Sequence, residues 1–570
     1  MTPTATGVPP PGPRAPRAAV SAAALLPAVL LLLMVVRLPW SGDLGMHAAV
    51  LERLRADLFH PGNPLVDEDT PSPYHSPWMV LLALLASATG LGTFSVLRLA
   101  ALVDLVLLVS GVAVFVRTFT RERAAVPLAL LCLLCLYGVR LFAWSGFPGL
   151  TSLCLALAYP STFALGLAFH LWALLRRAVA GAWRTPAFLG LGLLLAWVLL
   201  AHQFTGAVAV LGAVAMLLGA RPWPARAVWL RAGAGAAVAL VVPACWPYYS
   251  FYALLGTGGL DAIHRPLYAH LTARFCLVLL GAAALAARAS RDRRDPLVLF
   301  FGLGLVVFAA GGVTGHQAWG RILPAVLVPA QVALALETAR RAALVPLTAA
   351  ALLVGAWTQA GVLTYVLRPA AVPPVLRQVR AVALWPSFAW AAREVPKGQT
   401  VLTDDYYALR MLPAYGAYTV APAYPDVFLR DEGRRWEATH RYFAAATSRA
   451  ERLGILKEYG VRWVVQRNGG PGLAPGDPVL RRVASGPRGL VLWEVVSGRS
   501  SGGAGSARRT GSTGGVRGSG GAGTVGALGF SGAAGDFRAS GSSGAAVGSW
   551  ASGSSEVLAA SADRAPAGVR

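Results

Sequence analysis

The sequence predicts an all-α, multi-pass membrane bundle of about 11 transmembrane helices, with a small extracytoplasmic α/β domain near its end and a disordered tail. The 570 residues are 56% hydrophobic and only 13% charged, whereas a soluble globular chain carries about 25% charged residues. Apolar stretches such as 22–36, 99–116 and 343–366 are near the roughly 20 residues that a helix needs to cross a bilayer core. Arginines gather in the short gaps between these stretches, which is typical of a membrane protein.

The formal net charge of +24 does not indicate a nucleic-acid partner, because the basic residues follow the membrane segments. Every second expected span ends at a cluster of arginines, and such clusters mark the cytoplasmic face. These spans are expected at 93–116, 152–175, 203–220, 270–287 and 321–339. A disordered arm (1–19) with Arg14 and Arg17 is therefore expected in the cytoplasm, and the first span (20–38) runs outward.

The segment 39–92 between the first two spans is rich in proline and charge and predicts a long outer loop. Residues 42–58 have helical apolar spacing, which suits a helix that lies in the membrane interface. Residues 78–88 are apolar but too few to cross, so they are expected to be interfacial or re-entrant. If they did cross, the later arginine clusters would lie outside, and this alternative is rejected on that ground.

The transmembrane domain is expected to cover 20–368, and residues 369–497 have the polar composition of a small extracytoplasmic α/β domain. Strands are predicted at 400–402, 462–466, 479–484 and 490–496, and helices at 432–446 and 448–459. Residues 498–570 are Gly/Ser/Ala repeats that cannot bury a core, so they predict a disordered tail.

Polar residues suited to chemistry collect on the expected outer face. Asp43 directly follows the first span, where a helix end would fix the position of a carboxylate base. Arg321 begins a late span, and a guanidinium there can hold a phosphate by paired hydrogen bonds. The other candidates for binding a phosphate or an acceptor hydroxyl are His202, Arg265, His316 and His75.

Simpler interpretations stay open for these residues. Asp43 can cap the helix that follows it, and Arg321 can anchor its span at the interface. The run Asp67-Glu68-Asp69 can bind a divalent cation or simply face solvent, so no metal ligand or other cofactor is assigned. Asp104, inside an expected span, must face the bundle or a partner.

Several short motifs resemble those of the GT-C superfamily of polyprenyl-phosphate-sugar glycosyltransferases, which includes protein O-mannosyltransferases, aminoarabinose transferases and arabinofuranosyltransferases. The resemblance covers roughly residues 20–497 in architecture. The residues that carry it are Gly42-Asp43, Ser76-Pro77-Trp78 to Gly90-Leu91-Gly92-Thr93 with Leu97-Arg98-Leu99, Ala201-His202-Gln203-Phe204-Thr205, Gly320-Arg321-Ile322-Leu323-Pro324, Val401-Leu402-Thr403-Asp404, and Tyr459-Gly460-Val461-Arg462-Trp463-Val464-Val465. The acidic pair common after the first span is reduced here to Asp43-Leu44.

The resemblance implies a bilayer-embedded enzyme that moves a sugar from a polyprenyl-phosphate donor to an extracytoplasmic glycan, lipid or protein acceptor. Asp43 would deprotonate the acceptor hydroxyl, and Arg321, with Arg265 or His202, would bind the leaving lipid phosphate. A single displacement would invert the sugar carbon.

Two other functions compete with this expectation. A non-catalytic scaffold or lipid-binding subunit of an envelope-assembly complex would use the same outer face. A secondary transporter would place polar groups near the middle of the membrane in repeated halves, but mid-span charge is nearly limited to Asp104 and no repeat is evident.

Overall fold

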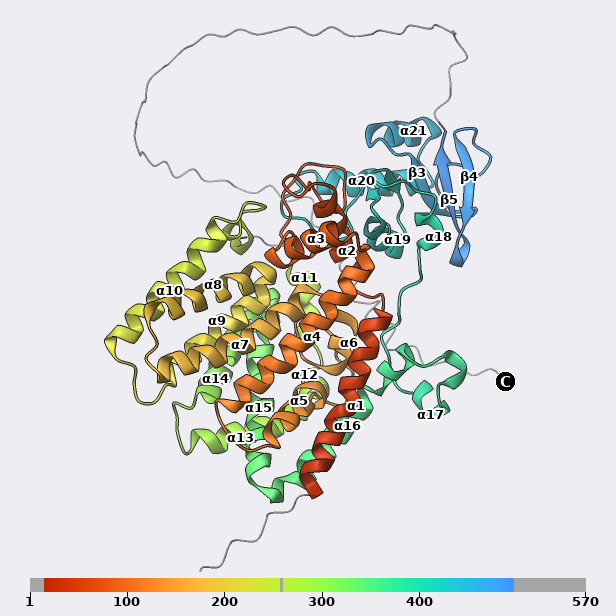
Figure 1. The fold of residues 1–570 in the computed structure, drawn as a ribbon. Helices are drawn as coiled ribbons and strands as arrows, with labels where there is room; N and C mark the ends of the chain where they lie inside the picture. Colours follow the sequence, from red (N-terminus) through yellow and green to blue (C-terminus); the bar gives the residue numbers. More distant parts are fainter. Residues whose placement is uncertain (1–14, 257–259, 497–570) are drawn as a thin grey trace, which may run out of the picture.

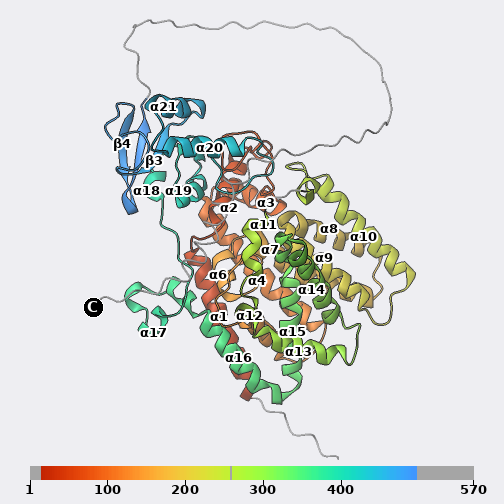
Figure 2. The ribbon, with the colours of Figure 1, turned by 180° about the vertical axis from the view of Figure 1, so that it is seen from behind.

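The computed structural model describes residues 15–256 and 260–496, which form a helical bundle with a small sheet domain at one end (Figures 1 and 2). The first helix, α1 (Ala15–Arg37), begins inside the expected arm. The rest of that arm and the expected tail at 498–570 lie outside the described residues.

Six segments are long and apolar enough to cross a membrane, and one of them joins the short helix η3 (Gln317–Ile322) to α15 (Pro324–Arg340). The others are Val20–Arg37 of α1, α4 (Thr93–Arg117), α7 (Pro160–Ala180), α10 (Arg226–Ala244) and α14 (Pro296–Thr314). The shorter apolar helices of the bundle are α5 (Ala125–Cys135), α8 (Thr185–Ala201), α9 (Gln203–Leu218), α13 (Val278–Ala289) and Ala342–Thr358, which joins η4 (Ala342–Leu344) to α16 (Val345–Thr358). The predicted multi-pass bundle is confirmed, and the count of eleven spans stays a prediction.

Two of the expected spans are interrupted. The span expected at 152–175 divides into α6 (Leu150–Ala156) and α7, which starts at Pro160 because proline suits the first turn of a helix and not its interior. The span expected at 270–287 divides into α12 (Leu271–Phe275) and α13. The connection before it holds η1 (Tyr252–Gly256), α11 (Asp261–His264) and η2 (Arg265–Tyr268).

The helix α15 is the centre of the bundle. Nearly all of its residues are buried, and it packs against α5, α13 and α14. A helix that is apolar on every face is stable only when it is surrounded in this way. Its first turn follows directly on η3, so a buried helix fixes the position of Arg321.

The two helices of the expected outer loop lie between the bundle and the sheet domain (Figure 1). Ser76 caps α3 (Pro77–Thr89), whose 13 residues span about 20 Å against a hydrocarbon core of about 30 Å. The helix α3 is therefore shorter than a full span, and its interfacial or re-entrant position stays a prediction. The helix α2 (Leu44–Ala56) forms where expected, but most of its residues are buried rather than exposed at an interface.

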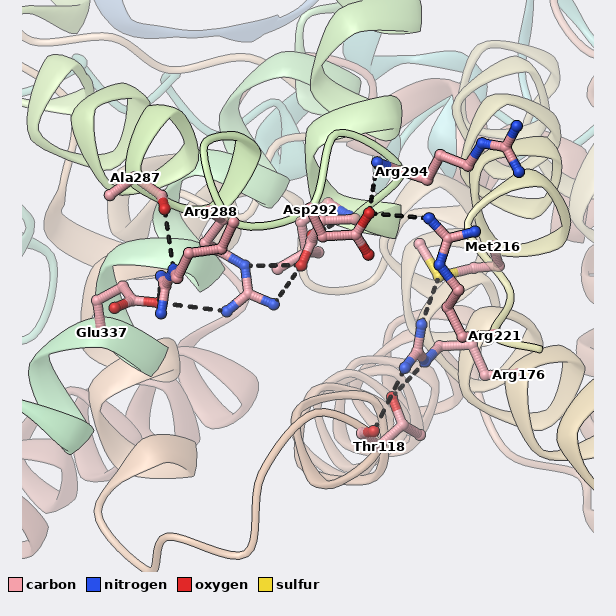
Figure 3. A network of polar contacts seen from close by, with 12 residues as sticks. Thr118, Arg176, Met216, Arg221, Ala287, Arg288, Asp292, Arg294 and Glu337 are labelled. Atoms are coloured by element: carbon pink, nitrogen blue, oxygen red, sulfur yellow. Dashed lines mark hydrogen bonds and ion pairs between the residues drawn. The ribbon is translucent and has the colours of Figure 1, made fainter. Parts of the chain in front are cut away.

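The arginine clusters meet at the bundle end far from the sheet domain (Figures 1 and 3). Arg176 Nε donates to Thr118 Oγ1 at 3.0 Å, which joins the ends of α7 and α4. Glu337 of α15 is 2% exposed and pairs with Arg291 at 2.6 Å and Arg288 at 3.4 Å. The expected alternation of spans thus brings these clusters together, and the membrane side on which they lie stays a prediction.

The sheet domain contains a five-stranded sheet with the order β2-β1-β3-β5-β4. The first three strands in that order are parallel, and β5 and β4 are antiparallel to their neighbours. Its strands are β1 (Thr400–Leu402), β2 (Tyr418–Thr419), β3 (Trp463–Arg467), β4 (Leu480–Ser485) and β5 (Leu490–Val495). Its helices are α18 (Ala389–Ala392), α19 (Tyr406–Met411), η7 (Pro413–Tyr415), α20 (Glu432–Phe443), α21 (Arg449–Glu458) and η8 (Pro487–Gly489). The predicted small α/β domain is confirmed, and only the two-residue strand β2 had no counterpart among the predicted strands.

The sheet domain packs directly on α2 and the loop after it. Arg53, 6% exposed, donates to the carbonyl oxygens of Gly416 at 3.0 Å and Ala417 at 2.5 Å, with its guanidinium 3.5 Å from the Tyr418 ring centre. Thr419 N donates to the carbonyl oxygen of Leu65 at 2.8 Å. Buried hydrogen bonds to a charged group are among the stronger ones, so α2 and the sheet domain form one unit.

Candidate functional site

Asp43 lies in the turn between α1 and α2, and two tyrosines hold this turn. Gly42 adopts φ +57, a conformation that glycine accepts without strain. Tyr159 donates its hydroxyl to the carbonyl of Ser41 at 2.5 Å, and Tyr424 donates to that of Gly42 at 3.0 Å. Asp43 occupies the cap position of α2, but its side chain makes no capping hydrogen bond. The carboxylate is therefore available for another partner.

Arg321 is 6% exposed and lies in a small pocket beside the N-terminal ends of α9 and α15. Its Nη2 donates to Ser145 Oγ at 3.3 Å and lies 3.0 Å from His202 Nε2. The Phe204 ring centre is 4.8 Å from the guanidinium carbon, a distance at which an aromatic face attracts a cation. The pocket is lined by Ser145, Gly146, Phe147, Leu165, His202, Phe204, Thr205, Val208, Arg321 and Pro324.

Gly146 leaves room beside the polar groups of this pocket. Its φ is +81, and a Cβ built there would lie 3.4 Å from both His202 Cε1 and Thr205 Oγ1 and 3.9 Å from Arg321 Nη2. Any other residue would be strained by the backbone and would extend toward these donors. The pocket thus combines a cation, two hydroxyls and an imidazole around a wall that has no side chain.

His202 caps α9 and is the pocket's imidazole. Its Nδ1 lies 2.7 Å from Thr205 Oγ1 and 3.2 Å from the Thr205 backbone nitrogen. Burial, and then the positive charge of Arg321, hold the pKa of His202 well below its usual value. A neutral imidazole at physiological pH can donate or accept one hydrogen bond without adding charge.

The electrostatics of Asp43 connect it to this pocket. Burial raises the pKa of the Asp43 carboxyl above its usual value, and the charges of Arg321 and then Arg410 partly oppose this rise. The side chains of Tyr74 and Arg321 are also within mutual electrostatic range. Asp43 and Tyr74 therefore lie within electrostatic range of Arg321, although neither of them lines its pocket.

The sheet domain supplies a second guanidinium to this site. Asp405 accepts hydrogen bonds from Tyr407 N at 3.0 Å and Ala408 N at 2.9 Å and so caps α19, whose last turn carries Arg410. The Arg410 guanidinium lies 3.7 Å from the Tyr406 ring centre and 5.0 Å from that of Tyr424. The site is thus built from the bundle on one side and the sheet domain on the other.

The structure brings together three of the residues proposed from sequence, namely Asp43, Arg321 and His202. It places the other three elsewhere. His75 is 1% exposed, with its ring against Tyr248 and its carbonyl accepting from Trp246. Arg265 is exposed, and His316 is exposed and stacks on Trp319 with ring centres 5.5 Å apart.

Sequence reasoning missed Arg410, Tyr424, Ser145 and Gly146. Ser145 and Gly146 lie in the turn Trp144-Ser145-Gly146-Phe147-Pro148 between two apolar segments, a pattern that marks a turn but no ligand. His47, one helical turn after Asp43, also had no role assigned from the sequence. Its ring lies 4.7 Å from that of Tyr159, and its Nδ1 has no hydrogen-bond partner among the described residues.

Within residues 15–256 and 260–496, no three histidine, cysteine, aspartate or glutamate side chains come together as a metal site. Glu68, in the acidic run considered for a cation, forms an ion pair with the buried Arg435 of α20. Asp67 and Asp69 are exposed. In this run, Glu68 joins the outer loop to the sheet domain.

No family model and no curated protein matches the sequence. Among solved structures, the fold is similar to that of the arabinofuranosyltransferase AftD from Mycobacteria, with a TM-score of 0.50 at 16% identity. That alignment covers 84% of this chain and 40% of AftD, so the chain spans less than half of the AftD chain. ArnT from Cupriavidus metallidurans follows, with a TM-score of 0.48 at 16% identity, covering 84% of this chain and 98% of ArnT. A structure of ArnT bound to undecaprenyl phosphate gives 0.46 at 15% identity, covering 84% and 99%.

These solved proteins are GT-C glycosyltransferases. The chain accordingly has a GT-C-like fold, as the resemblance of its motifs implied. Together with the apolar helices, this fold defines a multi-pass membrane protein with a small α/β domain at one end.

Proposed function

We propose that the chain is an inverting membrane glycosyltransferase that moves a sugar from a polyprenyl-phosphate donor to a glycan, lipid or protein acceptor outside the cytoplasm. The observation that carries the proposal is the pairing of two groups in one site. An uncapped carboxylate, Asp43, lies within electrostatic range of a buried guanidinium, Arg321, whose pocket holds further hydrogen-bond donors. Glycosyl transfer to a hydroxyl needs a base and a binding site for the leaving phosphate.

The pocket suits a phosphate on chemical grounds. Arg321 supplies a charge-assisted donor, and the hydroxyls of Ser145 and Thr205 supply neutral donors. The pocket lies at the end of membrane-spanning helices, so a donor lipid can keep its chain in the bilayer while its phosphate reaches the pocket. In this scheme the negative charge that develops on the departing phosphate is stabilised by Arg321.

Asp43 acts as the general base of this reaction. It accepts the proton of the acceptor hydroxyl while that oxygen bonds to the anomeric carbon. The bond between the anomeric carbon and the phosphate oxygen breaks, and its electron pair leaves with the phosphate. The charges of Arg321 and Arg410 limit the rise that burial causes in the Asp43 pKa.

We also propose an orientation for the protein. The arginine clusters at the far end of the bundle favour the cytoplasmic side for that end, which places the sheet domain and the site outside the cytoplasm. A reporter enzyme fused after Val496 tests this orientation. Activity of a reporter that works only outside the cytoplasm supports it, and activity of a cytoplasmic reporter contradicts it.

The proposed function is tested by reconstituting the protein in vesicles with a radiolabelled polyprenyl-phosphate sugar and measuring transfer to glycan, lipid and peptide acceptors. Arg321→Gln is expected to lower kcat by about 10²–10³-fold, the effect of removing one donor from a developing negative charge. Arg265→Gln, an exposed arginine at the same end of the bundle, is the matched control and is expected to retain activity. Equal activity of the wild type and both variants would contradict the assignment of Arg321 to the site. If the wild type transfers sugar to none of the acceptors, the alternative function of a non-catalytic scaffold is favoured.

A further inference from the structure

A side lobe formed by residues 366–384 projects from the bundle beside α1 and α16 (Figures 1 and 2). It contains the short helices η6 (Pro369–Ala371) and α17 (Pro374–Arg377) and leads into the chain that rises to the sheet domain. The sequence analysis placed most of this segment in the α/β domain. The structure separates it from the sheet, whose domain begins at α18.

The root of the side lobe is fixed at the sheet-domain end of the membrane-spanning helices. Arg37, the last residue of α1, donates from Nη2 to the carbonyl oxygen of Val366 at 3.3 Å. Tyr365 donates its hydroxyl to the carbonyl oxygen of Val382 at 2.9 Å, which closes the lobe at its base. Trp357, 51% exposed in the last turn of α16, lies just before it, and exposed tryptophan is typical of the boundary between lipid and water.

The surface of the side lobe is apolar and basic. Val372 and Leu376 point inward at 8% and 9% exposure, whereas Val375 is 51% exposed and Leu384 42% exposed. The neighbouring residues Pro369, Ala370, Ala371, Pro373 and Pro374 are exposed as well. Exposed apolar residues in such a run mark an interaction surface.

The charge of the side lobe indicates which kind of partner it binds. The lobe carries Arg368, Arg377 and Arg380, all exposed, and the sequence contains no aspartate or glutamate between Glu337 and Glu394. A basic, apolar element at the boundary between lipid and water matches a surface of anionic headgroups over acyl chains.

We propose that the side lobe is a membrane-interface element that inserts its apolar tip into the leaflet on the sheet-domain side and binds anionic lipid headgroups through its arginines. This inference does not depend on the proposed glycosyl transfer. It assigns the lobe to the lipid surface, and it makes the lobe the membrane-bound root of the chain that carries the sheet domain.

Spin labelling of the full chain in vesicles tests the proposal. The exposed Cys245 and the half-buried Cys276 are first replaced by serine, since the other three cysteines are buried, and a nitroxide is attached at Val375→Cys. With anionic vesicles, the label is expected at a depth of about 5–10 Å, measured by its relative accessibility to oxygen and to a water-soluble nickel complex. Leu32→Cys on the exposed face of α1 is the hydrocarbon reference, and Arg482→Cys on β4 is the aqueous reference.

The arginines are tested in the same samples. The pair Arg368→Gln and Arg377→Gln is expected to move the Val375 label toward water in anionic vesicles, and raised salt is expected to do the same for the wild type. Loss of the depth difference between anionic and neutral vesicles in this variant supports the charge assignment. A label at Val375 that is as accessible to nickel as that at Arg482, in both kinds of vesicle, would overturn the proposal.

Discussion

At the scale of single residues, the site is a carboxylate placed between two guanidinium groups. Arg321 comes from the centre of the bundle and Arg410 from the sheet domain, and both lower the pKa of Asp43 against the effect of burial. Burial outweighs these cations, so the pKa of the Asp43 carboxyl lies above its usual value, and the cations limit that rise. The same cations would repel a cationic acceptor and favour a neutral or anionic one.

Replacing Arg410 by glutamine tests how far the two guanidinium groups oppose the effect of burial on the Asp43 pKa. The variant loses one of the two charges that lower the Asp43 pKa, so the acid limb of the kcat/KM profile is expected to move to higher pH. Transfer near the lower end of the active range should therefore fall more than transfer at its plateau. The measurement is the pH profile of sugar transfer, with Arg434→Gln, an exposed arginine of the same domain, as the control. If the acid limb of the profile does not move in Arg410→Gln, the assignment of Arg410 to the site is contradicted.

Six residues were proposed from the sequence, and three of them lie near one another in the structure. Asp43, Arg321 and His202 lie at the ends of apolar segments. Residues at helix ends on the same face of a bundle lie close to one another. Arg410 could not be found in this way, because it lies about 90 residues beyond Arg321 in a domain whose docking on α2 has no periodic signature. His75 and His316 lie at the expected face, but their rings turn toward Tyr248 and Trp319.

At the scale of elements, α2 is the part that joins the two halves of the molecule. Its first turn follows Asp43, its buried Arg53 binds the turn before β2, and its Glu52 pairs with Lys397 at 2.5 Å. A shift of α2 against the sheet domain would therefore separate Asp43 from Arg410. The geometry of the site depends on this contact.

Gly45→Ala tests the contact between α2 and the sheet domain. A Cβ at Gly45 would overlap the backbone carbonyl oxygen of Arg410, so the two elements must move apart. The expected result is faster proteolytic cleavage of the chain that precedes the sheet domain, together with an unfolding midpoint lowered by several degrees. A control is Gly433→Ala in α20, where a Cβ meets nothing within 4 Å and the better helix former should stabilise by up to about 1 kcal/mol. Equal cleavage of both variants would contradict this account.

The elements of the sheet domain were largely predictable, because its strands and its two longer helices are bounded by clear turn residues. The helix boundaries of the bundle were harder to predict from the sequence. Apolar composition identified its spans, but it gave no sign of the break between α12 and α13. The helix α2 was assigned an interfacial position from its apolar spacing, and the face assumed to meet lipid is covered instead by the sheet domain and α3. Spacing predicts an apolar face and does not say what covers it.

At the scale of the whole molecule, the sheet-domain end buries several neutral histidines. Burial lowers the pKa of His47 to about 3 and those of His75 and His264 to about 4, from an ordinary value of 6.5. Between pH 6.5 and about 4 the unfolded chain binds protons at these positions and the folded chain does not. The histidines therefore contribute stability that is complete above pH 6.5 and is lost as the pH falls through this window.

The variant His47→Gln is expected to flatten the dependence of the unfolding midpoint on pH between 6.5 and 4. Asp43, Asp426 and Glu432, whose carboxyl pKa values are raised by burial, act in the opposite direction. The informative quantity is therefore the difference in slope between variant and wild type. Equal slopes for His47→Gln and the wild type would show that His47 is not buried neutral.

The architecture of the whole chain was predictable because a bilayer allows few solutions. Each apolar segment must be helical and long enough, and the arginine clusters must share a side. These two conditions placed Asp43, Arg321 and the sheet domain at the same end of the bundle. They do not determine the number of helices that cross, because several bundle helices are shorter than a full span.

The central claim is that Asp43 is the base of a glycosyl transfer. Asp43→Asn removes the basic group and keeps nearly the same shape. Reconstituted in vesicles with a polyprenyl-phosphate sugar, this variant is expected to lose sugar transfer by about 10²–10⁴-fold, with an unfolding midpoint close to that of the wild type. Transfer by Asp43→Asn at the wild-type rate would contradict the account.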